Sequence, residues 1–312
     1  MQPEWSPRIS WPDLPNHVQT GVEQILGEPV VQTAAQQGGF SPGTADRVRT
    51  VSGRRAFVKA VGPHLNEHSP ALHRREAAIT AALPDTLPAP ALLGTFDDGD
   101  WVALVLSDVD GRHPHVPWRA GELAAVLDAL LVLSRTPVPA ALKHLPTLAE
   151  ELGGGFRGWH RIRRNPPAGC DPWILENLGV LEQLAESGLE DLKGGSLVHT
   201  DVRADNILIR PGSGAVLVDW PWACIGQGWM DALGVLVNVR AFDPAFDVDA
   251  VLQSHPVFAA AETYSVDRVL SGLGAYFTDA ARLPSPPGLP TLRTFQRRQA
   301  EAVIRWLRDR LS

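Results

Sequence analysis

Cysteine is scarce in this sequence, with two residues, Cys170 and Cys224, among 312. They lie far apart and have no metal-site spacing, so neither a disulfide framework nor a zinc site is indicated. Long hydrophobic runs are also missing, and no stretch of about 20 apolar residues is present to cross a bilayer. The first 15 residues carry prolines and acids without an apolar core, which excludes a signal peptide. We therefore expect a soluble, cytoplasmic protein with no membrane partner.

Lysine is almost absent among the basic residues: 25 are arginine and three are lysine, Lys59, Lys143 and Lys193. Arginine thus supplies positive charge where solubility alone requires it, and a lysine inside a strand-like run needs a specific reason. The net charge of −7 argues mildly against nucleic acid as a partner. The content of 44% hydrophobic and 20% charged residues excludes a disordered chain.

The order of the predicted elements indicates two lobes. We expect an α+β fold with a small, mostly antiparallel N-lobe at residues 1–106, a connector at 107–111 and a larger helical C-lobe at 112–312. Strands are predicted by apolar or alternating runs at residues 29–36, 44–51, 56–61, 88–96 and 101–106. Helices are predicted at residues 16–27, with Asn16 as cap, 69–83, with Ser69 and Pro70 as cap, 120–134, 145–164, 173–187, 230–241, 259–281 and 292–311.

The strongest local signal is a polar loop between two apolar runs at residues 197–209, LVHTDVRADNILI. It contains His-x-Asp-x-x-x-x-Asn, and a later apolar run ends at the carboxylate of Asp219. Phosphoryl transfer requires a carboxylate that orients the nucleophilic hydroxyl and accepts its proton, and hard oxygen ligands that hold Mg²⁺ against the phosphates. A hairpin with Asp201 in its leading loop, Asn206 at the loop's end and Asp219 at the tip of the return strand supplies both. The alternative is a polar turn with solvated acids.

This pattern resembles the catalytic loop and metal-binding segment of the protein-kinase-like fold, in the form found in the aminoglycoside phosphotransferase and choline kinase family. The family commonly has His-Gly-Asp-x-x-x-x-Asn, and here Thr200 replaces the glycine. The resemblance implies a protein-kinase-like two-lobe fold, with Asp201 as catalytic base and Asn206 and Asp219 as Mg²⁺ ligands.

Other residues near this pattern receive less specific roles. By resemblance, His199 and Asp231 support the backbone of the loop. Arg203 lies where kinase loops often carry a cation that reaches the γ-phosphate, and a surface arginine is the alternative. Trp222 and Asp205 are candidates for contact with the acceptor, with a core tryptophan and a solvated acid as the alternatives.

The N-lobe supplies the positive charge. Lys59 lies in the strand-like run 56–61, and Glu76 in the following helix is its expected partner. By resemblance, Lys59 contacts the α- and β-phosphates of ATP or GTP, and Glu76 holds its ammonium group. A compact lysine fits such a slot where an arginine fork does not. The alternatives are a snorkelling strand lysine and an exposed helix glutamate.

Two backbone segments complete the predicted nucleotide site. A glycine-rich turn precedes the strand lysine by the length of one hairpin, so its amides would cover the phosphates; a plain hairpin turn is the alternative. By resemblance, the interlobe connector would bind the purine through backbone groups. The residues assigned to these two segments are Gly39, Ser41 and Gly43 in the turn, and Leu106, Ser107 and Val109 in the connector.

The segment after Asp219 indicates the class of acceptor. Asp231 follows after only 12 positions, which leaves no room for the long activation segment on which a protein kinase docks peptides. We therefore expect a small hydroxylated acceptor. The resemblance and the arginine-rich composition favour an antibiotic, aminoglycoside-like or another natural product, over a sugar, choline or an amino alcohol. Five acids either bind amino groups of the acceptor or are helix caps and solvated faces: Asp243, Asp247, Asp249, Glu262 and Asp267.

Two other classes of function match the residues less well. A catalytically silent nucleotide-binding module would not need the full set of catalytic groups. A metal-dependent hydrolase using His199, Asp201 and Asp219 would need a second cluster of ligands and would act without nucleotide. We expect Mg²⁺ and ATP or GTP as cofactors, and a monomer or a weak homodimer.

Overall fold

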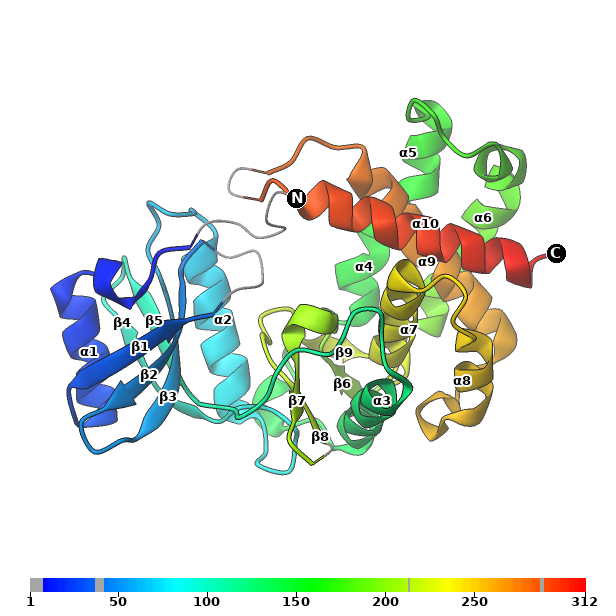
Figure 1. Ribbon diagram of the computed structural model, residues 1–312. Helices are drawn as coiled ribbons and strands as arrows, with labels where there is room; N and C mark the ends of the chain where they lie inside the picture. The colour runs from blue at the N-terminus through cyan, green and yellow to red at the C-terminus, as the bar shows by residue number, and fades with distance from the viewer. Residues whose placement is uncertain (1–7, 37–41, 213, 287–288) are drawn as a thin grey trace. The chain divides into compact units, whose positions relative to one another are not determined.

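The computed structural model describes residues 8–36, 42–212, 214–286 and 289–312 (Figure 1). Contacts divide the chain into two compact units. The first unit contains residues 1–114, 205–222 and 286–291, and the second contains residues 115–204, 223–285 and 292–312. The hairpin before Asp219 therefore groups with the first unit, whereas Asp201 belongs to the second. The expected division into a nucleotide-covering lobe, a connector and an acceptor-binding lobe stays a prediction.

The first unit is built on a five-stranded antiparallel sheet with the order β1-β2-β3-β5-β4. Side chains alternate between its faces along the central strand, β3. Ala56, Val58 and Ala60 pack in the core beneath α1, whereas Phe57 packs in the core beneath α2. The strands are β1 (Val30–Ala35), β2 (Thr44–Thr50), β3 (Arg55–Val61), β4 (Leu92–Asp97) and β5 (Val102–Ser107). The predicted antiparallel sheet is confirmed.

Two helices, α1 (Asn16–Leu26) and α2 (Ser69–Ala82), lie on opposite faces of this sheet, and the short η1 (Trp11–Asp13) precedes α1 (Figure 1). The predicted N-caps were wrong. Pro15 occupies the N-cap position of α1, so Asn16 is the first helical residue. At α2, the side chain of Asn66 accepts the N–H groups of His68 and Ser69, a cap that lies three residues before the predicted one.

A two-stranded hairpin also belongs to the first unit. It consists of η3 (Ala204–Asn206), of which Ala204 lies in the second unit, β7 (Ile207–Arg210) and β8 (Gly214–Leu217). The N–H of Leu217 donates to Pro88 O at 2.8 Å, and Arg112 forms a bridge with Ile209. These backbone bonds attach the hairpin to the segments before β4 and after β5.

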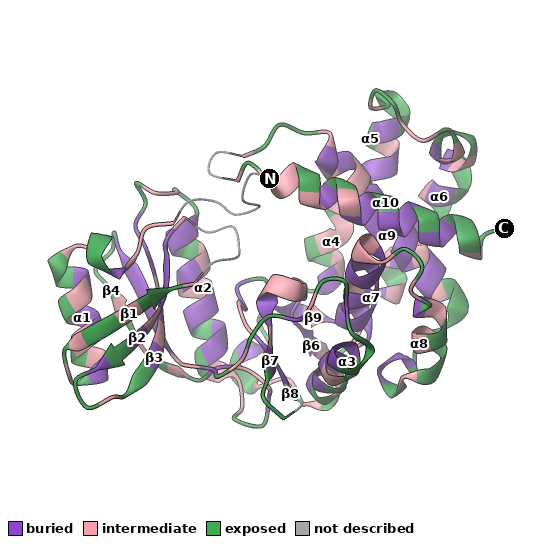
Figure 2. Cartoon of the chain, in the orientation of Figure 1, coloured by how far each residue is buried: buried purple, intermediate pink, exposed green. Residues whose placement is uncertain are grey.

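The second unit is organised around α9, which packs against α4, α5, α6 and α10. Figure 2 shows α7 and much of α9 as buried. The strand β6 leads into the polar loop and pairs with β9, which follows Asp219; neither this three-residue pair nor α8 was predicted. The elements are α3 (Ala120–Arg135), η2 (Ala140–Leu142), α4 (Leu148–Phe156), α5 (Gly158–Arg164), α6 (Pro172–Asp191), β6 (Ser196–Val198), β9 (Cys224–Gly226), α7 (Met230–Phe242), α8 (Val248–Ser254), η4 (Pro256–Phe258), α9 (Thr263–Ala281) and α10 (Leu292–Arg310).

The single helix predicted over residues 145–164 is two helices, α4 and α5, with Arg157 between them. Gly158 explains the break. A Cβ atom at this position would lie 2.3 Å from the carbonyl oxygen of Ala275 on α9. The chain therefore turns at a glycine because only glycine lets the two backbones approach so closely.

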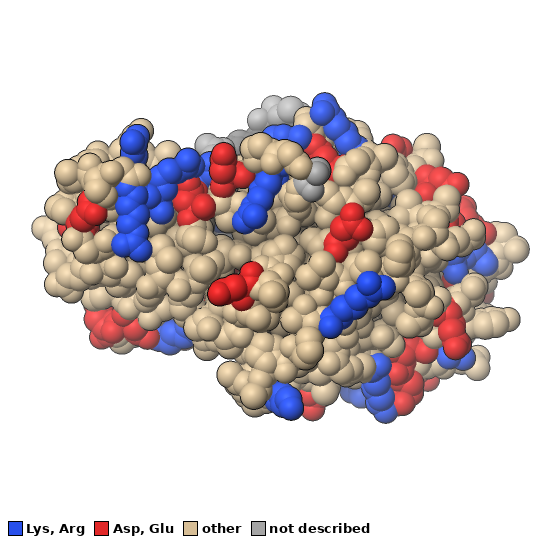
Figure 3. All heavy atoms as spheres, turned by 90° about the horizontal axis from the view of Figure 1, so that it is seen from below, with Lys and Arg blue, Asp and Glu red and all other residues tan. Residues whose placement is uncertain are grey.

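No helix in the described ranges is long and apolar enough to span a bilayer. On the face shown in Figure 3, basic and acidic side chains are interspersed and do not gather into a broad patch of one sign.

Candidate active site

Lys59 lies in the middle of β3, opposite Ala45 on β2 and Leu104 on β5. Strand alternation directs its side chain to the α2 face of the sheet. Its ammonium group donates to Glu76 Oε2 and to Asp219 Oδ1, both at 2.5 Å. Three residues that were selected from separate parts of the sequence therefore form one cluster inside the first unit.

Burial controls the charges of this Lys59–Glu76–Asp219 cluster. Glu76 is only 2% exposed, and burial raises the pKa of its carboxyl to about 7, although the Lys59 ammonium opposes this rise. Burial also acts to lower the pKa of Lys59, but Asp219 and then Glu76 outweigh it, so the pKa is raised. The Asp219 side chain is 33% exposed. Asp219 is therefore the more exposed of the two carboxyl groups that share the Lys59 ammonium.

The hairpin places Asn206 beside Asp219. In the hairpin, the paired residues nearest its open end are Ile207 on β7 and Leu217 on β8. Beyond this pair, the N–H of Val218 donates to Asn206 O at 3.0 Å. Asp219 follows with φ of 71°, in the left-handed region that aspartate enters more readily than most residues. The pairing therefore brings an amide oxygen and a carboxylate, both hard donors, to one end of the hairpin.

Asp231 fixes the backbone of the first part of the polar loop, which lies in the second unit, by accepting its hydrogen bonds. Its carboxylate accepts the N–H of His199 at 2.7 Å and the N–H of Thr200 at 2.8 Å. Burial raises the pKa of Asp231, and these hydrogen bonds oppose that effect. The N–H of Asp201 donates to His199 Nδ1 at 3.3 Å. These contacts are the ones that the supporting roles of His199 and Asp231 require, while the roles themselves stay predictions.

Arg203 is not a solvated surface arginine. Its side chain is 11% exposed, and its Nη1 atom lies 3.7 Å from Asp201 Oδ1. Its guanidinium group lies over the ring of Phe295 on α10, 5.4 Å from the centroid. The side chain is therefore fixed beside the predicted base, on the side of α10.

The predicted glycine-rich turn is described in part. Gly39 and Ser41 lie outside the described residues. Gly43 is described, and a Cβ atom there would lie 2.4 Å from the carbonyl oxygen of Ala60. Glycine is thus required where this segment crosses the end of β3, one residue beyond Lys59.

The predicted connector residues already have backbone partners in the first unit. The N–H of Ser107 donates to Ala91 O at 2.8 Å, and its hydroxyl accepts the N–H of Ala91 at 2.9 Å. The carbonyl of Val109 accepts Arg47 Nη2 at 2.8 Å, and Leu106 is buried. Trp222 is 41% exposed, and Asp205 is half-buried. The purine and acceptor roles of these residues stay predictions.

The sequence did not predict a pair of salt bridges that holds the connector to the sheet. Asp108, whose side chain is 4% exposed, is paired with Arg47 at 3.1 Å and Arg55 at 2.5 Å. Both arginines come from neighbouring strands, β2 and β3. Their alternation with buried residues was a signal that they point away from the α1 core, but it did not name Asp108 as the partner.

Sequence reasoning also missed His73 and Arg8. His73 lies on α2 one turn before Glu76, is 4% exposed, and has Nδ1 3.1 Å from Ser69 O. Burial and then Lys59 lower its pKa to about 3, so the ring is neutral. Burial lowers the pKa of Arg8, whereas Asp219 and two further acids raise it. His73 lies three residues before Glu76, a spacing that places both side chains on one face of α2 and could have predicted the histidine. No pattern in the sequence predicts that Arg8 lies near Asp219.

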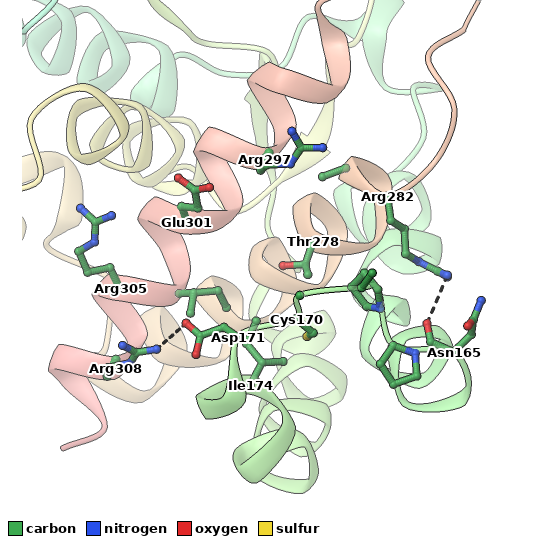
Figure 4. A pocket seen from close by; sticks show the side chains of 16 residues that line it. Asn165, Cys170, Asp171, Ile174, Thr278, Arg282, Arg297, Glu301, Arg305 and Arg308 are labelled. Carbon is green, nitrogen blue, oxygen red and sulfur yellow. Dashed lines mark hydrogen bonds and ion pairs between the residues drawn. The ribbon is translucent and has the colours of Figure 1, made fainter.

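A separate pocket of about 800 Å³ lies within the second unit (Figure 4). The loop of residues 165–171, the end of α9 and one side of α10 surround it. Arg297, Arg305 and Arg308 project from α10, and Arg308 is paired with Asp171 at 2.6 Å. The predicted site residues do not line this pocket, so it is not the candidate active site.

Comparison with known sequences gives the family. The sequence model of the phosphotransferase enzyme family, APH, matches residues 38–265. The chain belongs to the phosphotransferase enzyme family. This agrees with the resemblance of the polar loop to aminoglycoside phosphotransferases, which is thereby confirmed. No protein in the curated set matches this phosphotransferase.

Solved structures agree on the fold. An aminoglycoside phosphotransferase from Alicyclobacillus acidocaldarius is 16% identical, with a TM-score of 0.56 over 95% of this chain and 96% of the other. Spectinomycin phosphotransferase APH(9)-Ia, solved with ADP and spectinomycin, is 11% identical, with a TM-score of 0.58 over 91% and 95%. A candidate fructosamine-3-kinase from Haemophilus somnus is 11% identical, with a TM-score of 0.54 over 93% and 96%. The kinase-like fold is confirmed, and this phosphotransferase is a small-molecule kinase.

Proposed function

We propose that this phosphotransferase moves the γ-phosphoryl group of ATP or GTP to a hydroxyl group of a small natural product, with an antibiotic as the first candidate. The observation that carries the proposal is the buried Lys59–Glu76–Asp219 cluster, which holds a lysine between two carboxylates. The structures with similar folds include enzymes solved with spectinomycin and with hygromycin B, which supports an antibiotic as acceptor.

The cluster suits the donor side of the reaction. Lys59 would bind the α- and β-phosphates as a point charge, with Glu76 fixing the ammonium group. Relatives of similar fold were solved with ADP or AMP-PNP, which supports ATP as donor. The partly exposed carboxylate of Asp219 and the neighbouring amide of Asn206 are the oxygen donors that would hold a magnesium ion.

Magnesium fits this donor set. Among the described residues, no three His, Cys, Asp or Glu side chains gather as a metal site. A two-ligand protein site completed by phosphate oxygens and water is the usual arrangement for this ion in kinases. When bound, the ion would offset charge on the phosphates. Asp219 and Asn206 would orient the triphosphate by holding its counter-ion in a fixed place.

Asp201 is the proposed base on the acceptor side. The acceptor hydroxyl oxygen would attack the γ-phosphorus, the bond from the γ-phosphorus to the bridging oxygen would break, and the nucleoside diphosphate would leave. The proton of the hydroxyl would pass to the Asp201 carboxylate. Arg203, held 3.7 Å from Asp201, would offset the charge that develops on the transferred group.

A metabolite kinase is the second candidate, because a candidate fructosamine-3-kinase has a similar fold. Such an enzyme would use the same donor cluster and base, and would differ in the groups that bind the acceptor. A sugar, choline or another amino alcohol would then replace the antibiotic.

The test is an acceptor screen that measures release of ADP or GDP by the full chain with Mg²⁺. Asp201→Asn and Asp219→Asn are each expected to lower turnover by roughly 10³-fold, while circular dichroism shows a folded protein. Asp85→Asn, at an exposed position, is the matched control and should keep full turnover. Wild-type rates in both site variants would refute the proposal, as would turnover that needs no nucleotide.

A further inference from the structure

Three aromatic side chains of the second unit are linked to Asp201 through Arg203. The guanidinium group of Arg203 lies beside Asp201 and over the Phe295 ring. Phe295 meets Phe277 edge-on, with ring centroids 6.5 Å apart, and Phe277 meets Tyr276 at 5.0 Å. All three rings are half-buried. We call Tyr276, Phe277 and Phe295 the aromatic wall, and it provides partly exposed apolar surface connected to the proposed base through Arg203.

Two guanidinium groups and the Asp201 carboxylate act on the aromatic wall. Burial is the main cause that raises the pKa of Tyr276, and Asp201 adds to it. Arg293 and Arg203 act in the opposite direction, so both guanidinium groups lie within electrostatic range of the tyrosine hydroxyl. Arg293 also donates to Gln296 Oε1 at 2.7 Å and to Pro284 O, which holds it at the N-terminal end of α10.

Of two carboxylates in the α9 region, one is already paired and the other lies far from the aromatic wall. Asp279, one turn beyond Tyr276 on α9, is paired with Arg161 and Arg282, both at 2.6 Å. Glu262 precedes the first turn of α9, 14 positions before Tyr276, which is about 21 Å along the helix axis. Neither carboxylate is therefore placed to bind an ammonium group at the aromatic wall.

The other acids that were candidates for binding amino groups have structural partners. Asp249 and Asp267 both pair with Arg310, and Asp249 also accepts the indole N–H of Trp306. Asp247 caps α8 by accepting the N–H of Ala250 at 2.9 Å. Asp243 accepts the N–H of Ala245 at 3.2 Å. Asp247 is thus a helix cap, whereas Asp249 and Asp267 are ion-pair partners, a role that neither expectation named.

We infer that the acceptor is a neutral or acidic hydroxylated molecule with an aromatic or otherwise flat apolar face, and not a polyamine. This inference rests on the proposed function, because it places the acceptor beside Asp201. A flat face would stack on the aromatic wall and on the Arg203–Phe295 pair. A polycation would meet the guanidinium groups of Arg203 and Arg293 beside the aromatic wall.

Binding to the full chain saturated with Mg²⁺ and AMP-PNP tests this inference. The probes are chloramphenicol and 4-nitrophenyl β-glucoside as neutral aromatic alcohols, novobiocin as an acidic one, and kanamycin as a polyamine. Calorimetry is expected to show that at least one of the first three binds, and that kanamycin binds at least about tenfold more weakly, a difference of about 1.4 kcal/mol. Tighter binding of kanamycin, or no binding by all three non-cationic probes, would overturn the inference.

Variants locate the binding. Phe295→Leu keeps apolar volume but removes the ring under Arg203, and should weaken the non-cationic probe about tenfold. The chain has two tyrosines, both on α9, and Tyr264→Leu, at a position 74% exposed, is the control that should bind normally. Arg293→Ala should strengthen kanamycin binding several-fold. If Phe295→Leu bound the non-cationic probe as tightly as the control does, the aromatic wall would be excluded.

The two proposals fail in different ways. The proposed function fails if AMP-PNP does not bind, or if turnover is unaffected in Asp201→Asn. The inference fails if nucleotide binds and Asp201-dependent turnover is found, but with polyamines as the preferred acceptors.

Discussion

The two acid-bearing regions of this phosphotransferase are held in different ways. In the first unit, Asp219 is bound by a lysine 160 positions away, within a cluster of ionisable side chains in which Glu76 is buried. In the second unit, the loop before Asp201 is held by backbone N–H groups that donate to Asp231, 32 positions from His199. The first region depends on charge balance in a low-dielectric setting, and the second depends on the satisfaction of buried backbone donors.

This difference separates the expected effects of mutation. Changing one charge in the first region leaves another charge uncompensated, so ligand binding and catalysis should suffer together. Removing the acceptor in the second region leaves backbone donors without partners, so stability should suffer first. Substitutions in each region therefore test whether the contrast holds.

The largest effect is expected at Lys59. Lys59→Met leaves Glu76 and Asp219 without their shared cation, and should lower kcat/KM by roughly 10²- to 10³-fold. The same variant should lower the unfolding free energy by about 3 kcal/mol. This loss is smaller than the cost of burying an unpaired carboxylate, because Glu76 with its raised pKa can take up a proton. Lys59→Arg keeps the charge and should keep most of the stability, while kcat/KM still falls about 10²-fold.

Steady-state kinetics and urea unfolding measure both effects. Lys193→Arg is the control, because Lys193 is 64% exposed and pairs only with nearby Glu190 in the contacts described; it should match the wild type. Normal kcat/KM in Lys59→Arg would show that the slot does not depend on a compact ammonium group.

The next largest effect is expected at Asp231. Asp231→Ala removes the acceptor of two N–H groups in the loop and should lower the unfolding free energy by about 3 kcal/mol. Asp231→Asn keeps one acceptor oxygen and should lose about half as much. Asp247→Ala removes a helix cap and is expected to cost about 1 kcal/mol. Urea unfolding gives the ranking, and an Asp231→Ala cost no larger than the Asp247→Ala cost would remove the contrast between the two regions.

Much of the first region was predictable from the sequence, because its signals are local. The apolar run of residues 56–61 marked Lys59 as a strand lysine, and the helical position of Glu76 made it a partner for that lysine. The direct contact of Lys59 with Asp219 was less accessible, because it depends on how a distant hairpin attaches to the sheet. The hydrogen bonds of Leu217 and Ile209 that attach it are backbone bonds, which any residue type can form.

The second region was less predictable, because its features depend on tertiary contacts. The strands β6 and β9 are three residues each, too short to show a period. The break between α4 and α5 follows from the close approach of Gly158 to α9, which no helical pattern reveals. The place of Arg203 over Phe295 joins a loop to a helix more than 90 positions later, and the sequence does not link these two residues.

A pH-dependent effect is expected at His73, in the first region. Its pKa is about 3 in the folded protein, against an ordinary value of 6.5, so the unfolded chain binds more protons between these values. Stability from this residue is therefore full above about pH 6.5 and is lost as the pH falls toward 3. Between about pH 6.5 and 5 the loss should reach roughly 1.5 kcal/mol.

Urea unfolding at several pH values isolates this residue. In His73→Met, stability relative to the wild type should rise as the pH falls below about 6.5, because the variant has no imidazole to protonate on unfolding. His144→Met, at an exposed position, should follow the wild type at every pH. Parallel curves for His73→Met and the wild type would mean that the ring is charged, or solvated, in the folded protein.

The smallest effect is expected at Thr200, within the second region. Its φ of 66° lies in the left-handed region, which costs a residue with a Cβ atom about 1–2 kcal/mol, and the loop pattern that this chain resembles has glycine there. Thr200→Gly should relieve that strain, while the more flexible unfolded chain offsets part of the gain. The expected net result is about 0.5 kcal/mol of added stability with turnover retained, because the N–H that donates to Asp231 remains.

Thr136→Gly, at φ of −77°, gains no such relief and should lose about 1 kcal/mol. Urea unfolding of the two variants decides the point: equal losses at both positions would show that Thr200 carries no strain, and that its hydroxyl or methyl group stabilises the loop instead.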